Sequence, residues 1–483
     1  MKDKCRKEKA FTNIGLKSCV SVVIILLVVL AISGALSYFI PQGSFETAVD
    51  ADGNDKIIPG TYHSDGVIDG IAIWRVITAP VRVFFTGDWL NIVMISVFLL
   101  VMSGVFNLLE KTNGIKVLIG RIMRKLKDKG APVVCLSVLV FMLFGSFFGM
   151  FEELTTLIPI MVMFALSMGM DTMTGVGACM LAACFGFSAA ITNPFSVGLV
   201  AQEAGVGPLE GVWLRIVFFA IIYAIVCVFL MLHLRKIERD PTSSPTYEAD
   251  LEKKAKLEEM PAEKIENSDR IFRTYAIFFI AQMLVLILVA SVRAISGLAI
   301  PILAVSFLVG GIIAGLSVTE RKSDTFRYML KGAAAMLPAV LMIALASSVS
   351  LVLAESGILH TIMNSVIVLL DGKSKFFCVL LIYFLILFLQ LFIGSASAKI
   401  RLVMPIVMPI CAALGISPAI VILAYCMADG FTDVIIPTNP VLLVGLSMAN
   451  TTYGKWVRWT WKLQLIVFAL TIGVLYFACA IGY

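Results

Sequence analysis

Charged side chains lie inside otherwise apolar stretches of this sequence, where ionic groups are rare. Four are acids and two are bases: Glu152, Glu153, Asp429, Asp433, Lys399 and Arg401. An ionised side chain at membrane depth costs several kcal/mol unless it is paired or reached by water. Six such groups are therefore expected to share a purpose, and the excess of acid favours a ligand or co-ion that carries positive charge.

Asp429 and Asp433 are four residues apart, a spacing that predicts two carboxylates on one face of a helix. Two carboxylates in that arrangement can bind a cationic side chain, Na⁺ or a proton. The alternative is that they only neutralise Lys399 and Arg401. We assign the pair to ion coupling and keep the alternative open.

Two stretches of the chain repeat one pattern of Gly, Pro and Asn residues. Pro159 corresponds to Pro405 and Gly169 to Gly415, and each pair is 246 positions apart. A constant offset across several such residues indicates an internal duplication, which many secondary transporters contain. The functional side chains are expected where the two copies meet.

The same offset aligns Glu153 with Lys399, so one copy has an acid where the other has a base. Facing each other across a two-fold axis, the two side chains can meet opposite ends of a zwitterion. Alternatively, they pair with each other and only hold the copies together. Other polar residues nearby complete the predicted lining: Glu152, Thr155, Ser395 and Ser397.

Each copy also contains a Thr-Asn-Pro tripeptide inside an apolar run, Thr192–Asn193–Pro194 and Thr438–Asn439–Pro440. Proline lacks an amide hydrogen and disfavours a helical conformation in the residue before it, so each tripeptide predicts a broken helix. Irregular backbone at membrane depth is tolerated only inside protein or beside a water-filled cavity. Two equivalent breaks therefore predict a binding site for a carboxylate or an ion near the middle of the membrane.

The composition identifies the protein class. Of the 483 residues, 60% are apolar and only 14% are charged, and the mean hydropathy is +0.98. A soluble globule of this length needs far more polar surface, so the chain is expected to be a polytopic membrane protein.

Metal, enzyme and nucleic-acid functions are not expected. The ten cysteines are scattered singly, and His63, His233 and His360 lie far apart, so no metal-type spacing exists. No nucleophile with its base, metal pair or Gly-x-Gly-Asp motif indicates an intramembrane enzyme. The basic residues lie where membrane topology requires them, which makes a nucleic-acid partner unnecessary. We expect no cofactor beyond a coupling ion, Na⁺ or H⁺.

The chain divides into two membrane repeats joined by a linker. A basic N-terminus, 1–17, precedes the first repeat, 18–234, and the second repeat, 271–483, follows the linker 235–270. Each repeat is expected to contain a re-entrant hairpin and a broken helix. These elements and the outer loop are predicted at 41–88 for the loop, 131–168 and 376–414 for the hairpins, and 172–204 and 418–448 for the broken helices.

The basic residues define the orientation. A cytoplasmic N-terminus and an outer C-terminus place 28 of the 38 lysines and arginines on the cytoplasmic side, as the positive-inside rule requires. The segment 70–85 is too interrupted to span and is predicted as an interfacial helix. The basic stretch 321–331 is predicted as a short loop. The resulting fold is all-α, with two inverted-topology repeats and about nine full spans.

Several strings resemble one known family. GMFEELTTLIPI at 149–160, TNPF at 192–195, GSASAK at 394–399, ADGFTD at 428–433 and IIPTNP at 435–440 are similar to the four-carbon dicarboxylate anaerobic carriers (DcuC-type), most of all their YfcC-like branch. Members of that branch are regarded as basic or short-chain amino-acid transporters. The resemblance covers most of the chain and implies the inverted-repeat fold of the wider ion-transporter superfamily. The first hairpin departs from related dicarboxylate carriers because it lacks their Ser-Asn-Thr sodium motif.

These observations predict a secondary active transporter in the cell membrane. The excess of acid repels a dianion, so an amino acid, such as arginine or ornithine, moved by exchange or ion coupling is the preferred substrate. A four-carbon dicarboxylate or another short-chain carboxylate is the alternative, and an ion channel is a third reading. The expected partners are a small-molecule substrate and lipid, with a monomer or a homodimer left open.

Overall fold

The computed structural model describes residues 16–49, 55–58, 60–64, 66–86, 89–115, 117–118, 121, 130–155, 157–258, 267–291, 299–370 and 373–483. Most of the predicted N-terminal segment 1–17 lies outside these residues. The described chain is helical, as predicted, apart from one small antiparallel sheet. Its strands, β1 (Thr47–Val49) and β2 (Asp55–Ile57), pair within the segment predicted as the outer loop.

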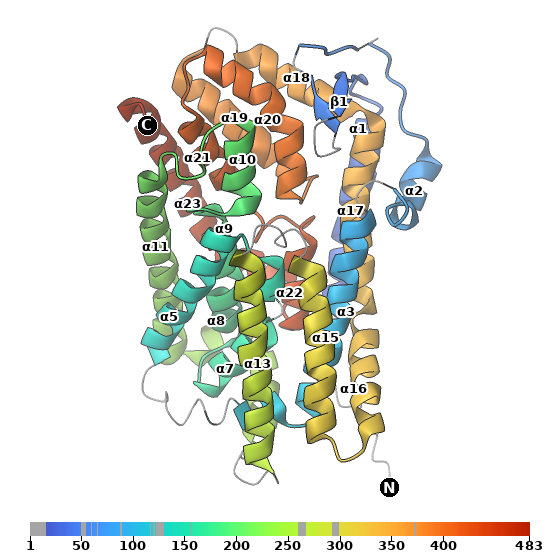
Figure 1. Cartoon of the computed structure of the whole chain (residues 1–483), viewed down its shortest axis with the longest axis vertical. Helices are drawn as coiled ribbons and strands as arrows, with labels where there is room; N and C mark the ends of the chain where they lie inside the picture. Colours follow the sequence, from blue (N-terminus) through green and yellow to red (C-terminus); the bar gives the residue numbers. More distant parts are fainter. Residues whose placement is uncertain are drawn as a thin grey trace.

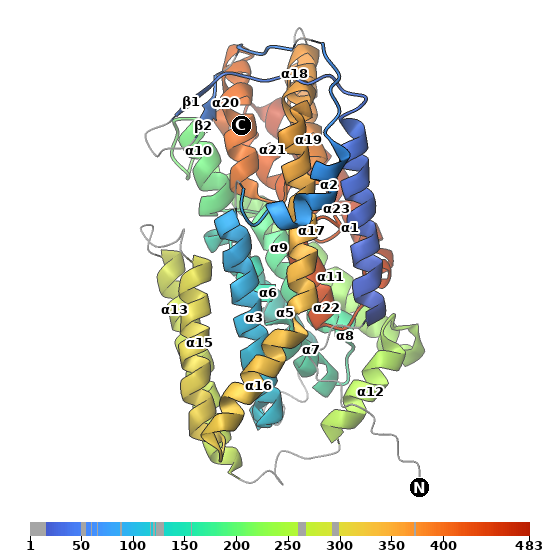
Figure 2. The ribbon, with the colours of Figure 1, turned by 90° about the vertical axis from the view of Figure 1, so that its right-hand side faces the viewer.

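One group of helices lies in the centre and on the right of Figure 1. In it, α3 packs against α15 and α16, α13 packs against α15, and α17 packs against α1 and α2 (Figures 1 and 2). The members are α1 (Leu16–Leu36), α2 (Ile73–Arg82), α3 (Trp89–Lys111), α13 (Ser268–Ser291), α15 (Ala299–Val318), α16 (Lys322–Ala335), α17 (Leu337–Ser356) and α18 (Ile358–Leu370).

A second group carries both predicted hairpins and both broken helices. From the first half it contains α5 (Gly130–Leu143), the π-helical turn η1 (Phe144–Phe148), α6 (Glu152–Thr155), α7 (Ile158–Ser167), α8 (Thr172–Val176), η2 (Gly177–Leu181), α9 (Ala182–Ser188), η3 (Pro194–Gly198), α10 (Leu199–Glu203) and α11 (Val212–Arg239). From the second half it contains α19 (Lys375–Gln390), α20 (Ala396–Ala413), α21 (Pro418–Asp429), α22 (Pro440–Met448) and α23 (Tyr453–Ile481). In Figure 1, α5 and α7 lie in the lower part of the molecule, whereas α19 and α20 lie in the upper part.

Six helices in the described chain have the length and composition to cross a membrane. They are Ile92–Lys111, Gly130–Phe148, Val212–Arg239, Pro301–Val318, Lys322–Ser356 and Tyr453–Ile481. Other apolar helices, such as α19 and α21, are shorter. The chain is therefore a multi-pass membrane protein, and nine full spans remains a prediction.

The prediction of a loop at 321–331 is wrong, because these residues begin helix α16. A Cβ at Gly332 would lie 2.4 Å from the carbonyl oxygen of Ser103 on α3, so α16 lies directly against α3. The Ser103 hydroxyl donates to the Gly332 carbonyl at 2.8 Å, and the Asn107 amide donates to the Tyr328 carbonyl at 2.6 Å. The basic residues suggested a loop, whereas the small and polar residues of the facing surfaces allow a packed helix.

The linker folds back on the membrane helices. After α11 it forms the 3₁₀ turn η4 (Pro241–Ser243) and then α12 (Tyr247–Glu258), which contacts α7; Figure 2 shows α12 at the lower end of the molecule. Asp250 is buried and accepts from the backbone N–H and the hydroxyl of Thr172. The Lys253 ammonium donates to the Thr172 hydroxyl at 2.8 Å and to the Ala449 carbonyl at 3.0 Å. Burial lowers the pKa of Lys253, and its contacts join the linker to both halves.

A second buried acid, Asp171, caps α8 beside the linker. Its carboxylate accepts from the backbone N–H of Thr174 at 2.9 Å, lies 2.9 Å from His233 Nε2 and accepts from Ser244 at 2.6 Å. Burial raises the pKa of Asp171, but its hydrogen bonds, with that from His233 the strongest, outweigh burial and lower the pKa to about 2. Trp459 Nε1, which can only donate, points to His233 Nδ1 at 3.1 Å, so the imidazole donates to Asp171 through Nε2.

Candidate functional site

The two Thr-Asn-Pro tripeptides form the same local structure. Asn193 Oδ1 accepts from the Phe195 amide at 2.9 Å, and Asn439 Oδ1 accepts from the Val441 amide at 2.9 Å. In each case the asparagine is the N-cap and the proline is the first residue of the next helix, where its missing N–H is not needed. The sequence therefore ends one helix and starts another at equivalent points of the two halves.

Each threonine of these tripeptides binds the backbone beside the predicted hairpin tip of its own half. The Thr192 hydroxyl donates to the Phe147 carbonyl at 3.3 Å, and the Thr438 hydroxyl donates to the Leu391 carbonyl at 2.8 Å. Both carbonyls belong to a helix end next to a hairpin tip, where backbone acceptors lack intrahelical partners. The breaks and the hairpin tips are thus held together in pairs.

Residues at equivalent positions of the two halves also touch each other. The Cys184 thiol donates to the Gly430 carbonyl at 3.1 Å. The rings of Phe185 and Phe431 pack edge to face, with their centroids 5.0 Å apart. Both pairs are separated by 246 positions.

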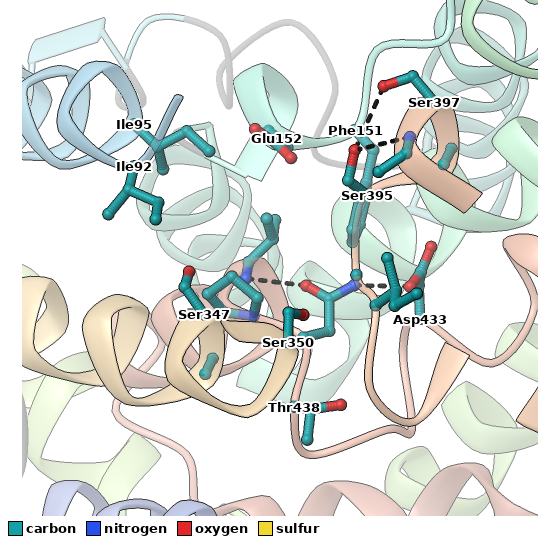
Figure 3. A pocket seen from close by; sticks show the side chains of 18 of the residues that line it. Ile92, Ile95, Phe151, Glu152, Ser347, Ser350, Ser395, Ser397, Asp433 and Thr438 are labelled. Carbon is teal, nitrogen blue, oxygen red and sulfur yellow. Dashed lines mark hydrogen bonds between the residues drawn. The ribbon is translucent and has the colours of Figure 1, made fainter. Parts of the chain in front are cut away.

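A cavity of about 430 Å³ opens between the two groups of helices. Ile92 and Ile95 of α3 and Ser347 and Ser350 of α17 line it from one side. The first hairpin tip, the N-terminal turn of α20 and the segment 433–441 line it from the other (Figure 3). The cavity volume is within the usual range for small-molecule sites.

The charged residues that line this cavity are acids. Glu152 and Asp433 contribute carboxylates, and none of the described lining residues is a lysine, an arginine or a histidine. The remaining polar lining consists of hydroxyl and amide side chains: Thr86, Ser347, Ser350, Ser395, Ser397, Thr438 and Asn439. The cavity is therefore suited to a ligand that carries positive charge.

Asp433 is held by two amides. Asn439 Nδ2 donates to Asp433 Oδ1 at 2.8 Å, and Gln390 Nε2 donates to the same oxygen. Because both donors use Oδ1, the carboxylate is fixed in orientation and Oδ2 is left to bind a ligand. Gln390 was not predicted from the sequence, and its position on the first helix of the second hairpin is the reason it reaches this acid.

The prediction that Asp429 and Asp433 share one helix face is wrong. Helix α21 ends at Asp429, and the residues after it form turns. A Cβ at Gly430 would lie 2.2 Å from the Ser188 hydroxyl, so the chain passes close to α9 at this point. The helix is interrupted there, and the two carboxylates bind different partners.

Asp429 forms an ion pair with Lys399 away from the cavity. The exposed fractions of their side chains are 1% and 0%, and neither residue lines the cavity. In a buried ion pair, the attraction between the two charges offsets the free-energy cost of removing them from water. This pairing matches the alternative in which Asp429 neutralises Lys399.

The predicted site residues fall into two sets. Seven of them line the cavity: Glu152, Ser395, Ser397, Asp433, Thr438, Asn439 and Pro440. Thr192, Asn193, Pro194, Lys399 and Asp429 do not line it, and Thr155 is buried beside a smaller pocket that also contacts Glu152. The side chain of Glu153 lies outside what the structure describes. Among the described residues, no group of three or more His, Cys, Asp or Glu side chains is placed to hold a metal ion.

Comparisons with known proteins identify the class. The family model described as C4-dicarboxylate anaerobic carrier (DcuC) matches residues 16–480. The chain therefore belongs to this family of membrane carriers.

Two relatives match over most of their length. The chain is 26% identical over 421 residues to the Escherichia coli (strain K12) protein named "Putative basic amino acid antiporter YfcC", covering 82% of this chain and 79% of the relative. It is 28% identical over 415 residues to an uncharacterized protein of Haemophilus influenzae, covering 83% of this chain and 77% of the relative.

Two solved transporter structures align with the whole chain at low similarity. The YdaH transporter of Alcanivorax borkumensis gives a TM-score of 0.41 at 18% identity, covering 96% of this chain and 98% of that one. MtrF of Neisseria gonorrhoeae, from a class of antimetabolite efflux pumps, gives a TM-score of 0.41 at 15% identity, with 96% of each chain covered.

Proposed function

We propose that this carrier is a secondary active transporter of an amino acid with a cationic side chain, and that the substrate binds in the cavity between the two helix groups. The observation that carries the proposal is the charge of the lining, where Glu152 and Asp433 are the ionic residues. Two carboxylates attract a cation and repel a dianion. The name of the Escherichia coli relative, a basic amino acid antiporter, agrees with this substrate class.

The substrate's own carboxylate binds at helix N-termini. Ser395 caps α20 and Asn439 caps α22, and the first residues of both helices line the cavity. The N-terminus of a helix carries partial positive charge, which suits a carboxylate. The α-ammonium group then binds Asp433 Oδ2, so both charged ends of a zwitterion have partners without a basic side chain.

The two halves act as inverted repeats around this cavity. The contacts between Cys184 and Gly430 and between Phe185 and Phe431 support a two-fold axis, because a residue on such an axis meets its own counterpart. In Figure 1, α11 leads down toward the linker, whereas α23 ends near the top of the molecule, as inversion requires. Alternating access by rocking or an elevator-type motion follows from this symmetry.

The predicted orientation places the linker in the cytoplasm and the C-terminus outside, in the cell membrane. Asp433 is the residue we assign to coupling, because it alone of the two predicted coupling acids lines the cavity. In an ion-coupled mechanism Asp433 binds Na⁺ or H⁺ when the substrate is absent. In an exchange mechanism Asp433 binds the incoming and the outgoing substrate in turn. Asp429 instead balances Lys399.

A four-carbon dicarboxylate is the second candidate. The family description names that substrate, and two helix N-termini at one cavity suit two carboxylates. The acids of the lining oppose it. The deciding factor is whether Asp433 and Glu152 are ionised when substrate binds.

Counterflow in proteoliposomes tests the proposal. Vesicles loaded with lysine, arginine, ornithine, succinate or fumarate are compared, with and without Na⁺ and pH gradients. We expect accumulation of labelled lysine or arginine only against a basic amino acid. Counterflow of succinate with no response to any amino acid would establish the dicarboxylate instead.

A further inference from the structure

The cavity lining obeys the 246-residue offset. Five pairs of equivalent residues line the same space, one member from each half: Gly149 and Ser395, Phe151 and Ser397, Glu152 and Ala398, Phe187 and Asp433, and Phe195 and Val441. Equivalent residues meet in one cavity only if the two-fold axis that relates the halves passes through that cavity. The ligand therefore contacts corresponding positions of both halves.

The two faces formed by these pairs differ in chemistry. The second half contributes two hydroxyls and a carboxylate from Ser395, Ser397 and Asp433. The first half contributes three phenyl rings, Phe151, Phe187 and Phe195, which we call the aromatic wall. Phe151 and Phe187 are 6% and 9% exposed, so their rings are held by the surrounding protein.

A ligand that fits both faces has a zwitterionic end and an apolar body. Phenyl rings bury aliphatic carbon efficiently, and their faces attract ammonium and guanidinium groups through cation–π contacts. Glu152 follows Phe151 in the sequence and lines the cavity beside it (Figure 3). A lysine-like side chain has an apolar stem and a charged end. An aromatic surface with an acid beside it can bind both parts.

We propose that the aromatic wall is a side-chain subsite, which selects amino acids with long cationic side chains over short or neutral ones. The wall packs against the methylene stem, and Glu152 pairs with the terminal cation. This inference rests on the proposed amino-acid function and adds the orientation of the substrate in the cavity. The polar end faces the second half, and the side chain faces the first half.

A series of substrates that differ in one property at a time tests this assignment. Alanine, norleucine, ornithine and lysine compete with labelled lysine for counterflow by the full-length protein. Norleucine has the aliphatic stem of lysine without its ammonium group, and alanine has neither. Phe187→Ala, Phe187→Leu and Glu152→Gln are compared with Phe477→Ala, a matched control whose exposed ring lies on α23.

Phe187→Ala should weaken competition by lysine and norleucine about tenfold and leave alanine within about twofold. Glu152→Gln should weaken lysine and ornithine by a similar factor and leave norleucine unchanged. Phe187→Leu retains apolar volume and should lie between Phe187→Ala and the wild type, which protects the test if the smaller side chain disturbs folding. Phe477→Ala should match the wild type.

Equal weakening of all four competitors by Phe187→Ala would overturn the subsite, as would an unchanged lysine affinity. In either case the wild-type protein still transports basic amino acids, so the proposed function stands. If the wild type responds to no amino acid, both the subsite and the proposed function are wrong.

Discussion

The two halves of this carrier form the same cap at their helix breaks and differ in the side chains that line the cavity. At both breaks an asparagine caps the helix that a proline begins, and the same bond length of 2.9 Å closes both caps. In each half, a glycine with a positive φ follows the C-terminal end of a helix: Gly169 follows α7, and Gly415 follows α20. Yet Phe187 of the first half stands where Asp433 stands in the second.

The difference indicates which features serve the scaffold and which serve the ligand. Caps and glycines must recur because each half has to satisfy its broken backbone inside the membrane. Side chains at the cavity are free to diverge, because the proposed amino-acid substrate is itself asymmetric. The repeated caps therefore belong to the frame, and the unlike walls of the cavity fit the two unlike ends of the proposed amino-acid substrate.

The largest expected effect concerns the pair that exists only in the second half. Lys399→Met leaves Asp429 buried without its partner, and breaking such a pair costs about 3–5 kcal/mol. We expect a strong loss of thermal stability, measured by fluorescence-detected size-exclusion chromatography. The double variant Lys399→Met/Asp429→Leu should recover most of it, and a double variant as unstable as the single one would contradict a purely structural pair.

Asp433→Asn tests the functional side of the comparison. A hydrogen bond to a charged group contributes about 1.5–3 kcal/mol, which corresponds to about 10- to 100-fold in affinity. We expect that loss in lysine counterflow with normal expression and thermal stability. The matched change Asp429→Asn should instead lower stability, and equal transport by Asp433→Asn and the wild type would contradict the site.

Asp171→Ser tests a cap that differs between the halves. The equivalent residue is Ser417, which caps α21 through its hydroxyl at 3.1 Å, so serine can retain the cap but loses the contact with His233. A pKa lowered from 3.8 to about 2 contributes about 2 kcal/mol of stability at neutral pH. That contribution is complete above the usual pKa and is lost as the pH falls from about 4 to 2.

Thermal stability measured across this pH range gives the readout. The wild type should lose stability between pH 4 and 2 by more than Asp171→Ser does. If the thermal stability of the two proteins falls equally with pH, the pKa of Asp171 is not lowered in the folded protein, which would contradict the prediction.

The smallest effect separates the two caps. Asn193→Ala and Asn439→Ala should each lower stability by about 1 kcal/mol, because each removes an N-cap. Only Asn439 lines the cavity and orients Asp433, so only Asn439→Ala should also raise the apparent KM for lysine. A similar KM increase in both variants would mean that the first break also contacts substrate.

Much of the frame could be predicted because Pro, Gly and Asn act locally. Thr192–Asn193–Pro194 and Thr438–Asn439–Pro440 specify their own caps whatever surrounds them. Helix α16 was missed because its charges resemble a loop, and the contact between Gly332 and α3 depends on a distant segment. The outer helix α2 was expected from its amphipathic pattern, which is also local.

The site was predicted less completely, because cavity lining depends on tertiary contacts. Ser347 and Ser350 lie on one face of a long apolar helix, and nothing in their spacing marks that face. Phe151 and Phe187 could have been found, since the 246-residue offset leads to them directly from Ser397 and Asp433. They were not singled out because phenylalanine is abundant throughout this membrane protein.

A structure determined with saturating lysine tests the central claim most directly. The account predicts ligand density in the cavity between α17 and the hairpin tips, with the α-ammonium on Asp433, the carboxylate at the start of α20 and the side chain along Phe187. Density outside this cavity, or a lysine whose side chain points away from the three phenyl rings, would contradict it.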